Sequence, residues 1–163
     1  MSKKQLSGLA KVLVFLSDIL TSPAITSSNV TIGVTALTKK YTRSGGTSFI
    51  TEGFLAGDVV LIAGFVDGDS NGLKTIDTVA STYFTVVEAV GVNEAGTGNE
   101  LVILSAREVS TAHGLNKTPA LAFVTINSTV AEEHFTVTPG THDAINCKFT
   151  VTPGLLYQVV AVA

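Results

Sequence analysis

The sequence predicts a mainly β protein, with a small β-barrel or sandwich module, a second small β unit after it, and one N-terminal helix. Three observations predict this fold class. The hexapeptide Phe-Thr-Val-Thr-Pro-Gly occurs twice, as Phe135–Gly140 and Phe149–Gly154. Apolar and polar residues alternate in short runs from Val30 onward, which is the period of a half-buried strand. Residues 3–20 carry the strongest helical pattern in the chain.

The repeated hexapeptide predicts two strands that lie side by side. Each copy alternates apolar and Thr residues and stops at a Pro-Gly turn. The segment between the copies, Thr141–Lys148, is too short for a crossover helix, so antiparallel pairing is the simplest arrangement. We expect the apolar residues of both copies to face one core, namely Phe135, Val137, Phe149 and Val151.

The N-terminal helix is predicted from leucines that recur at spacings of three, four, three and four, which is a heptad seam. These are the candidate oligomer or lattice contact: Leu6, Leu9, Leu13, Leu16 and Leu20. The helix packs either on its own β core or on a neighbouring subunit. A third interpretation makes Val12–Leu16 a strand. Interruption by Lys11, Ser17 and Asp18 argues against a signal peptide or membrane span, so we expect the segment in the mature protein.

The spacing of strands and turns divides the chain into three parts. We expect an N-terminal helix or arm over 1–23, a β-barrel-like module over 24–110, and a small C-terminal β unit over 111–163. The strands expected after the first one, near Val30–Val34, are Val59–Ile62, Leu73–Val79, Tyr83–Val90, Leu101–Leu104, Ala120–Ile126, His134–Thr138, Cys147–Thr152 and Tyr157–Ala161.

The composition favours a structural role. Charged residues make up 14% of the chain, against about 25% in an average soluble domain. Such a surface suits a subunit that buries much of itself against others. The net charge is −3, and the short basic run at Lys39, Lys40 and Arg43 is interpreted as a solvated loop, so we expect no nucleic-acid partner. Cys147 is the sole cysteine, which excludes an intrachain disulfide and fits a small buried hydrophobe.

Residues that could carry chemistry are few, and we expect no enzyme activity, no cofactor and no catalytic residues. The loop Asp67–Gly72 has the first ligand positions of an EF-hand, but Thr78 stands where the bidentate Glu belongs and strands flank it, so a hairpin loop is favoured. His134 and His142 could meet across the paired repeats, but their spacing matches no metal motif, so we expect no metal site. The Gly91–Gly98 loop lacks the strand-then-helix setting of a dinucleotide site.

Two stretches resemble virion proteins of tailed bacteriophages. The first is similar to a β module of phage tail-tube and other virion proteins; its residues are Arg43–Phe49, Gly53-Phe54, Gly57-Asp58, Gly64-Phe65, Asn71-Gly72, Thr75-Ile76, Val79 and Thr85-Val86. The second, Ala112–Leu115 with Thr118-Pro119, resembles the His-Gly-Leu-Gly-x-Thr-Pro opening of a β unit in fibre and decoration proteins. Asn116 replaces the expected Gly there.

The resemblance implies a building block of a particle. The first candidate function is a capsid decoration (cement) protein that stabilises the phage head, with itself and the major capsid protein as partners. The alternative is a tail component, either a tube subunit or a fibre adaptor. The third is an adhesive or carbohydrate-binding β domain, which the absence of Trp disfavours. We expect a virion protein that assembles in the host cytoplasm, with no membrane partner.

Overall fold

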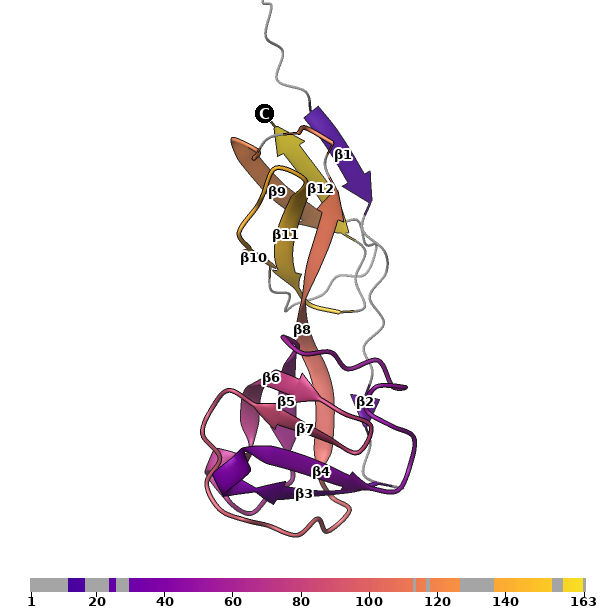
Figure 1. Ribbon diagram of the computed structural model, residues 1–163, viewed down its shortest axis with the longest axis vertical. Helices are drawn as coiled ribbons and strands as arrows, with labels where there is room; N and C mark the ends of the chain where they lie inside the picture. The colour runs from indigo at the N-terminus through magenta and orange to yellow at the C-terminus, as the bar shows by residue number, and fades with distance from the viewer. Residues whose placement is uncertain are drawn as a thin grey trace, which may run out of the picture. The chain divides into compact units, whose positions relative to one another are not determined.

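The computed structural model describes residues 12–16, 24–25, 30–112, 114–116, 118–126, 137–153 and 157–162. The chain divides into two compact units. We call Thr21–Arg107 the central module, and Met1–Leu20 with Glu108–Ala163 the terminal module. The described chain is mainly β, and its strands pair antiparallel (Figure 1). Val12–Leu16, within the part expected to form an N-terminal helix or arm, contributes strand β1 to the terminal module.

The central module is one antiparallel sheet in the order β2-β8-β5-β6-β7-β4-β3. Register shifts near Val59 and between Ile76 and Thr78 bend the strands. Because β2 comes shortly before β3 in the chain, the two ends of this sheet are consecutive in sequence. The strands are β2 (Ala24–Ile25), β3 (Thr31–Thr35), β4 (Lys40–Ser44), β5 (Val59–Ala63), β6 (Gly72–Val79), β7 (Tyr83–Val86) and β8 (Leu101–Ala112), the last extending past the module boundary.

One hydrophobic core lies inside the central module. Alternate residues of β3 to β8 point into it and are buried, among them Ile32, Val60 and Val102. Its aromatic centre places the Tyr41 and Phe84 rings 5.2 Å apart, and the Tyr41 hydroxyl donates to the Ser70 carbonyl at 2.8 Å. Since residues from all six strands join one cluster, the bent sheet wraps around a common interior.

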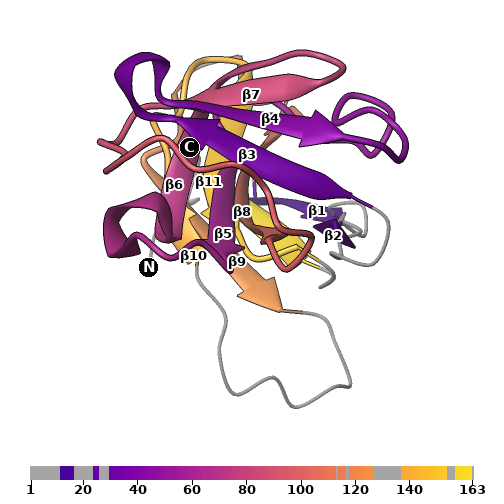
Figure 2. The same ribbon diagram turned by 90° about the horizontal axis from the view of Figure 1, so that it is seen from below.

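The edge strand β3 is covered by residues 91–100, which we call the closing loop (Figure 2). Glu94 and Val34 exchange both backbone hydrogen bonds, at 2.8 and 3.0 Å. Asn93 Oδ1 accepts from the Ala36 amide at 2.8 Å, and the Glu100 carboxylate accepts from the Ile32 amide at 3.2 Å. Every second amide of β3, which would otherwise be an unpaired edge donor, therefore has a partner.

The terminal module holds two small groups of strands. The first has the order β1-β12-β9, from Val12–Leu16, Tyr157–Val162 and Leu121–Ile126. In the second, β10 (Val137–Pro139) pairs with β11 (Asn146–Val151), which neighbours β8.

The expected pairing of the two hexapeptides is confirmed. Val137 lies opposite Val151, Thr138 opposite Thr150 and Pro139 opposite Phe149, so the copies are related by a local two-fold through the valine pair. The Gly140 amide donates to the Lys148 carbonyl at 2.7 Å, which makes this a hydrogen-bonded pair. Because hydrogen-bonded and non-bonded pairs alternate, the Pro139 position points its backbone away from β11 and its missing N–H costs the pairing nothing.

Two predictions about local structure are wrong. Val12–Leu16 is strand β1 and not part of a helix, because it pairs along its full length with β12, as the third interpretation of the sequence allowed. Lys39–Arg43 is not a solvated loop, since Lys40–Ser44 forms β4 between β3 and β7 and Arg43 is buried. The remainder of the expected helix lies outside the described residues.

Candidate interaction surface

An apolar stripe covers the outer side of the sheet formed by β6, β5 and β8. Leu61 on β5 lies directly opposite Leu73 on β6 and opposite Ile103 on β8, so the three residues form one row across the strands. Leu73 is 60% exposed and Leu61 is 41% exposed. We call this surface the aliphatic face, and its residues are Val59, Leu61, Ala63, Leu73, Leu101 and Ile103.

The alternation of the strands fixes this face outward. Val60 and Ile62 on β5 and Val102 and Leu104 on β8 are all at most 3% exposed and belong to the core. Turning either strand over would expose these residues and bury the aliphatic face in their place. The outward positions are therefore set by the core, and their apolar character is not needed for it.

An Asp and an Arg form an ion pair beside the aliphatic face. Asp58, directly before β5, accepts two hydrogen bonds from the Arg107 guanidinium, both at 2.7 Å. Arg107 Nη2 also donates to the Gly53 carbonyl at 2.6 Å. The hydrogen bonds that Arg107 donates to Asp58 outweigh partial burial and raise the pKa of Arg107. This pair joins the 53–58 loop to β8 and leaves neither charge available to a ligand.

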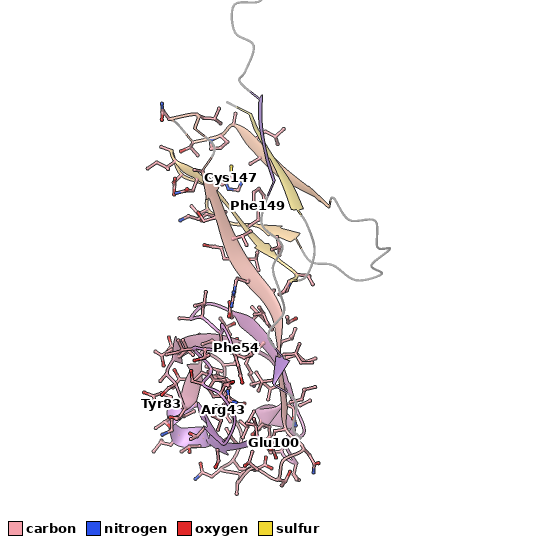
Figure 3. The ribbon with its side chains drawn as sticks, turned by 90° about the vertical axis from the view of Figure 1, so that its right-hand side faces the viewer. Arg43, Phe54, Tyr83, Glu100, Cys147 and Phe149 are labelled. Carbon is pink, nitrogen blue, oxygen red and sulfur yellow. The ribbon has the colours of Figure 1, made fainter. Side chains whose placement is uncertain are left out.

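The other buried charges of the central module are also occupied. Arg43, whose side chain is 2% exposed, forms a two-point ion pair with Glu52 at 2.7 and 3.0 Å, and its guanidinium stacks 4.8 Å from the Phe49 ring centre. Lys74 donates to the carbonyls of Asp69 and Ala89. Within the described residues, no buried side-chain nitrogen or oxygen lacks a hydrogen-bond partner. Figure 3 labels Arg43 and Glu100 within this module.

Glu100 ties the closing loop to β3. Its carboxylate is almost fully buried and accepts from the Ile32 amide at 3.2 Å, the Thr97 amide and hydroxyl at 2.6 and 2.7 Å, and the Gly98 amide at 3.0 Å. Burial alone would raise the pKa of Glu100, but these hydrogen bonds outweigh it and lower the pKa. A carboxylate with all its lone pairs engaged acts as a structural anchor.

A shallow pocket of about 180 Å³ lies between the Ser44–Ser48 turn and the Ser81-Thr82 turn. Its lining residues are Arg43, Gly45, Gly46, Thr47, Ser48, Ser81 and Thr82. Because Arg43 is already neutralised by Glu52, the pocket offers no free charge for a ligand. Its chemistry does not match any site expected from the sequence.

Two of the candidate ligand residues of the Asp67–Gly72 loop, Asp67 and Asn71, have their side-chain oxygens engaged within the loop's own fold. Asp67 accepts from the amide and hydroxyl of Ser70, both at 3.0 Å. Asn71 Oδ1 accepts from the Phe65 amide, and Asn71 Nδ2 donates to the Phe65 and Asp67 carbonyls. In the part of the chain that the structure describes, no group of three His, Cys, Asp or Glu side chains is placed to hold a metal ion.

The residues of the repeat region that could react are packed in the terminal module. The His142 ring lies 5.0 Å from the Phe149 ring, and its Nδ1 accepts from the Lys148 amide at 3.1 Å. His134, its expected neighbour, lies outside the described residues. Cys147 is buried on β11, two residues before Phe149 (Figure 3). Burial raises the pKa of the Cys147 thiol. A raised thiol pKa disfavours the reactive thiolate.

Two residues of the predicted contact seam, Leu13 and Leu16, lie in the described strand β1. Leu13 lies opposite Ala161 and Leu16 opposite Gln158 in the β1–β12 ladder. Val12–Leu16 is a strand, so the helical spacing on which the seam was predicted does not hold there, and the contact role of these leucines stays a prediction. Leu6, Leu9 and Leu20 lie outside the described residues. The aliphatic face, which sequence reasoning missed, is visible in the sequence only as unbroken apolar runs at Val59–Ala63 and Leu101–Leu104.

Comparison with protein-family models, with curated proteins and with solved structures gave no match to this chain. Among the described residues, no helix has the length and apolar character needed to cross a membrane.

Proposed function

We propose that this chain is a non-enzymatic structural subunit of a tailed-bacteriophage particle, and in the first place a decoration protein of the head. The observation that carries the proposal is the aliphatic face on a module whose buried charged side chains all have ion-pair or hydrogen-bond partners within the module. An enzyme of this size would need polar groups held ready for a substrate. In this module the buried polar groups instead form internal hydrogen bonds, and apolar side chains lie on the outer side of the sheet.

The resemblance of residues 43–86 and 112–119 to phage virion modules supports the same class of function. The residues of the first stretch hold the frame of the central module: Arg43 is paired, Phe49 and Phe54 are fully buried, and Asn71 bridges Phe65 and Asp67. In this chain the glycine and aromatic residues of the phage-like stretch stabilise the fold of the central module. We also infer that the central module is a small barrel, since β2 pairs with β8 and leads into β3, which the closing loop covers.

The test is to locate the protein on purified particles of the phage that encodes it. Gold-labelled antibody against the chain should decorate the shell of intact heads, and heads stripped of the protein should break at lower temperature or lower osmotic stress. Label confined to the tail would favour the alternative, a tube subunit or fibre adaptor. Absence of the protein from purified particles would overturn the proposal.

A further inference from the structure

We propose that the closing loop is a cover that opens as one unit while the rest of the central module stays folded. Opening uncovers the edge of β3, which the loop occupies in the closed state (Figure 2). The way the loop is held, the absence of buried side chains over most of its length and the separate support of β3 all point to this open state.

Hydrogen bonds that centre on Glu94 hold the middle of the loop. The Glu94 backbone donates to and accepts from Val34 of β3, at 3.0 and 2.8 Å. Its carboxylate accepts from the amides of Val66 and Asp67, both at 2.9 Å. One residue therefore joins the loop both to β3 and to the turn that follows β5, so its release loosens both contacts together.

The second half of the loop is tied into one piece by Glu100. The Glu100 carboxylate accepts from the Thr97 amide and hydroxyl, at 2.6 and 2.7 Å, as well as from the Ile32 amide of β3. Between the two carboxylates, an added Cβ on Gly96 would stand only 2.7 Å from the Ile32 nitrogen. Because this close fit lies two residues after Glu94, the loop cannot leave Val34 and the Val66–Asp67 turn without disturbing its contact with Ile32.

The loop is not anchored by apolar burial. From residue 91 to residue 99 no side chain is buried, and Val92, its one large apolar residue, is 53% exposed. Segments that are held by hydrogen bonds and have few buried apolar contacts open at the low end of the free energies found within a protein. The loop can therefore leave β3 without drawing an apolar side chain of its own out of the core.

β3 has support of its own when the loop is away. It pairs with β4 along the whole of Thr31–Thr35, and Ile32 and Val34 belong to the core cluster. The open state then presents the amides of Ile32, Val34 and Ala36 along one free edge, since these are the donors that the loop accepts from. An edge of this kind pairs with extended strands, so the loop controls whether β3 can accept one.

Native-state hydrogen exchange of the full chain at neutral pH tests the proposal. The amides of Ile32, Val34 and Ala36 should share one protection factor that depends little on low concentrations of urea, because opening the loop exposes little surface. The amides of Ile76 and Val86 donate to carbonyls elsewhere in the central module. They should be protected at least about tenfold more strongly and should respond to urea as the whole module does.

Glu94→Gln tests whether the loop opens as a unit. This change weakens the hold on the Val66–Asp67 turn and leaves the Glu100 carboxylate unchanged. Exchange should nevertheless rise at both Ile32 and Val34, and by the same factor of about five, which is the effect of losing about one net hydrogen bond. Asn93→Ala, at an exposed position, is a second variant and should also raise exchange at Ile32 and Val34 alike.

Glu88→Gln is the matched control. The Glu88 carboxylate lies outside the loop and accepts from the Thr75 amide and hydroxyl, at 2.7 and 2.8 Å. The control should raise exchange at Thr75 and leave Ile32 and Val34 unchanged. Circular dichroism of each variant checks that the strands are intact.

Two results would overturn the proposal. In the first, the β3 amides show the protection and the urea dependence of Ile76 and Val86, so that the loop opens only when the whole module unfolds. In the second, the effect of Glu94→Gln is confined to the amides of Val66 and Asp67, so that the parts of the loop move independently. Both results leave the location of the protein on a particle, and so the proposed function, to its own test.

Discussion

Replacing Glu100 by Gln tests whether the closing loop is held to β3 by one buried carboxylate. Each oxygen of the Glu100 carboxylate accepts two hydrogen bonds. One oxygen accepts from the Thr97 amide and hydroxyl, and the other oxygen accepts from the Ile32 and Gly98 amides. A Gln keeps one acceptor oxygen and turns an NH₂ group toward the other donors. The Thr97 hydroxyl can rotate and accept from it, but at least one buried amide then loses its partner.

An unpaired buried donor costs about 1–3 kcal/mol, so we expect Glu100→Gln to lower the free energy of unfolding by that amount at neutral pH. Urea unfolding followed by circular dichroism measures it, and amide hydrogen exchange at Ile32 and Thr97 should accelerate because opening becomes local to β3 and the loop. Glu108→Gln, at an exposed position, is the control and should cost little. A loss under about 0.5 kcal/mol with unchanged exchange at Ile32 would refute the anchor role.

The same carboxylate gives this prediction a pH signature. Because folding lowers the pKa of Glu100, its stabilisation is complete above the ordinary Glu pKa of about 4.3 and is lost as the pH falls through the lower folded value. The difference in stability between wild type and Glu100→Gln should therefore be constant near neutrality and shrink below about pH 4. A difference in unfolding free energy that stays the same in strong acid would show that the charge of Glu100 does not cause the stabilisation.

Two further changes probe the packing of each module. Phe149→Ala should cost the terminal module about 3–5 kcal/mol, the range for a buried Phe, since Phe149 is 1% exposed; a denaturant midpoint close to wild type would place the ring outside the core. Gly96→Ala should destabilise the central module, because an added Cβ would stand 2.7 Å from the Ile32 amide nitrogen, while Gly68→Ala, with open space around it, should be tolerated. Equal thermal midpoints for the two glycine variants would contradict the close approach of loop and strand.

The sequence predicts well those features that are written locally. Period-2 patterning places β5, β6 and β11 to within a residue or two, because each strand has one face in the core and one face out. The hexapeptide repeat predicts the β10–β11 pair, because a short link leaves antiparallel pairing as the simple option. The repeat's Phe135 lies outside the described residues, so its place in the core stays a prediction.

Where the sequence-based prediction is wrong, the local structure depends on residues that are distant in the sequence. Val12–Leu16 satisfies a helical seam and a buried strand equally well, and its pairing with β12, at the far end of the chain, selects the strand. Lys40–Ser44 looks like a polar loop because Arg43 is charged; only the carboxylate of Glu52 makes its burial possible. No sequence signal marks Glu100 as an anchor, since its donors come from Ile32 and from a loop without regular pattern.

The placement of proline in the repeated hexapeptide limits how far its sheet can grow. Pro139 has no amide to offer on the side of β10 that faces away from β11, so a further strand arriving there would find a gap in the ladder. The two copies of this hexapeptide pair as neighbouring strands, but a third strand would not form a complete ladder on the outer side of β10. The chain thereby carries a Val/Thr-rich strand that closes into a pair and resists stacking into fibrils.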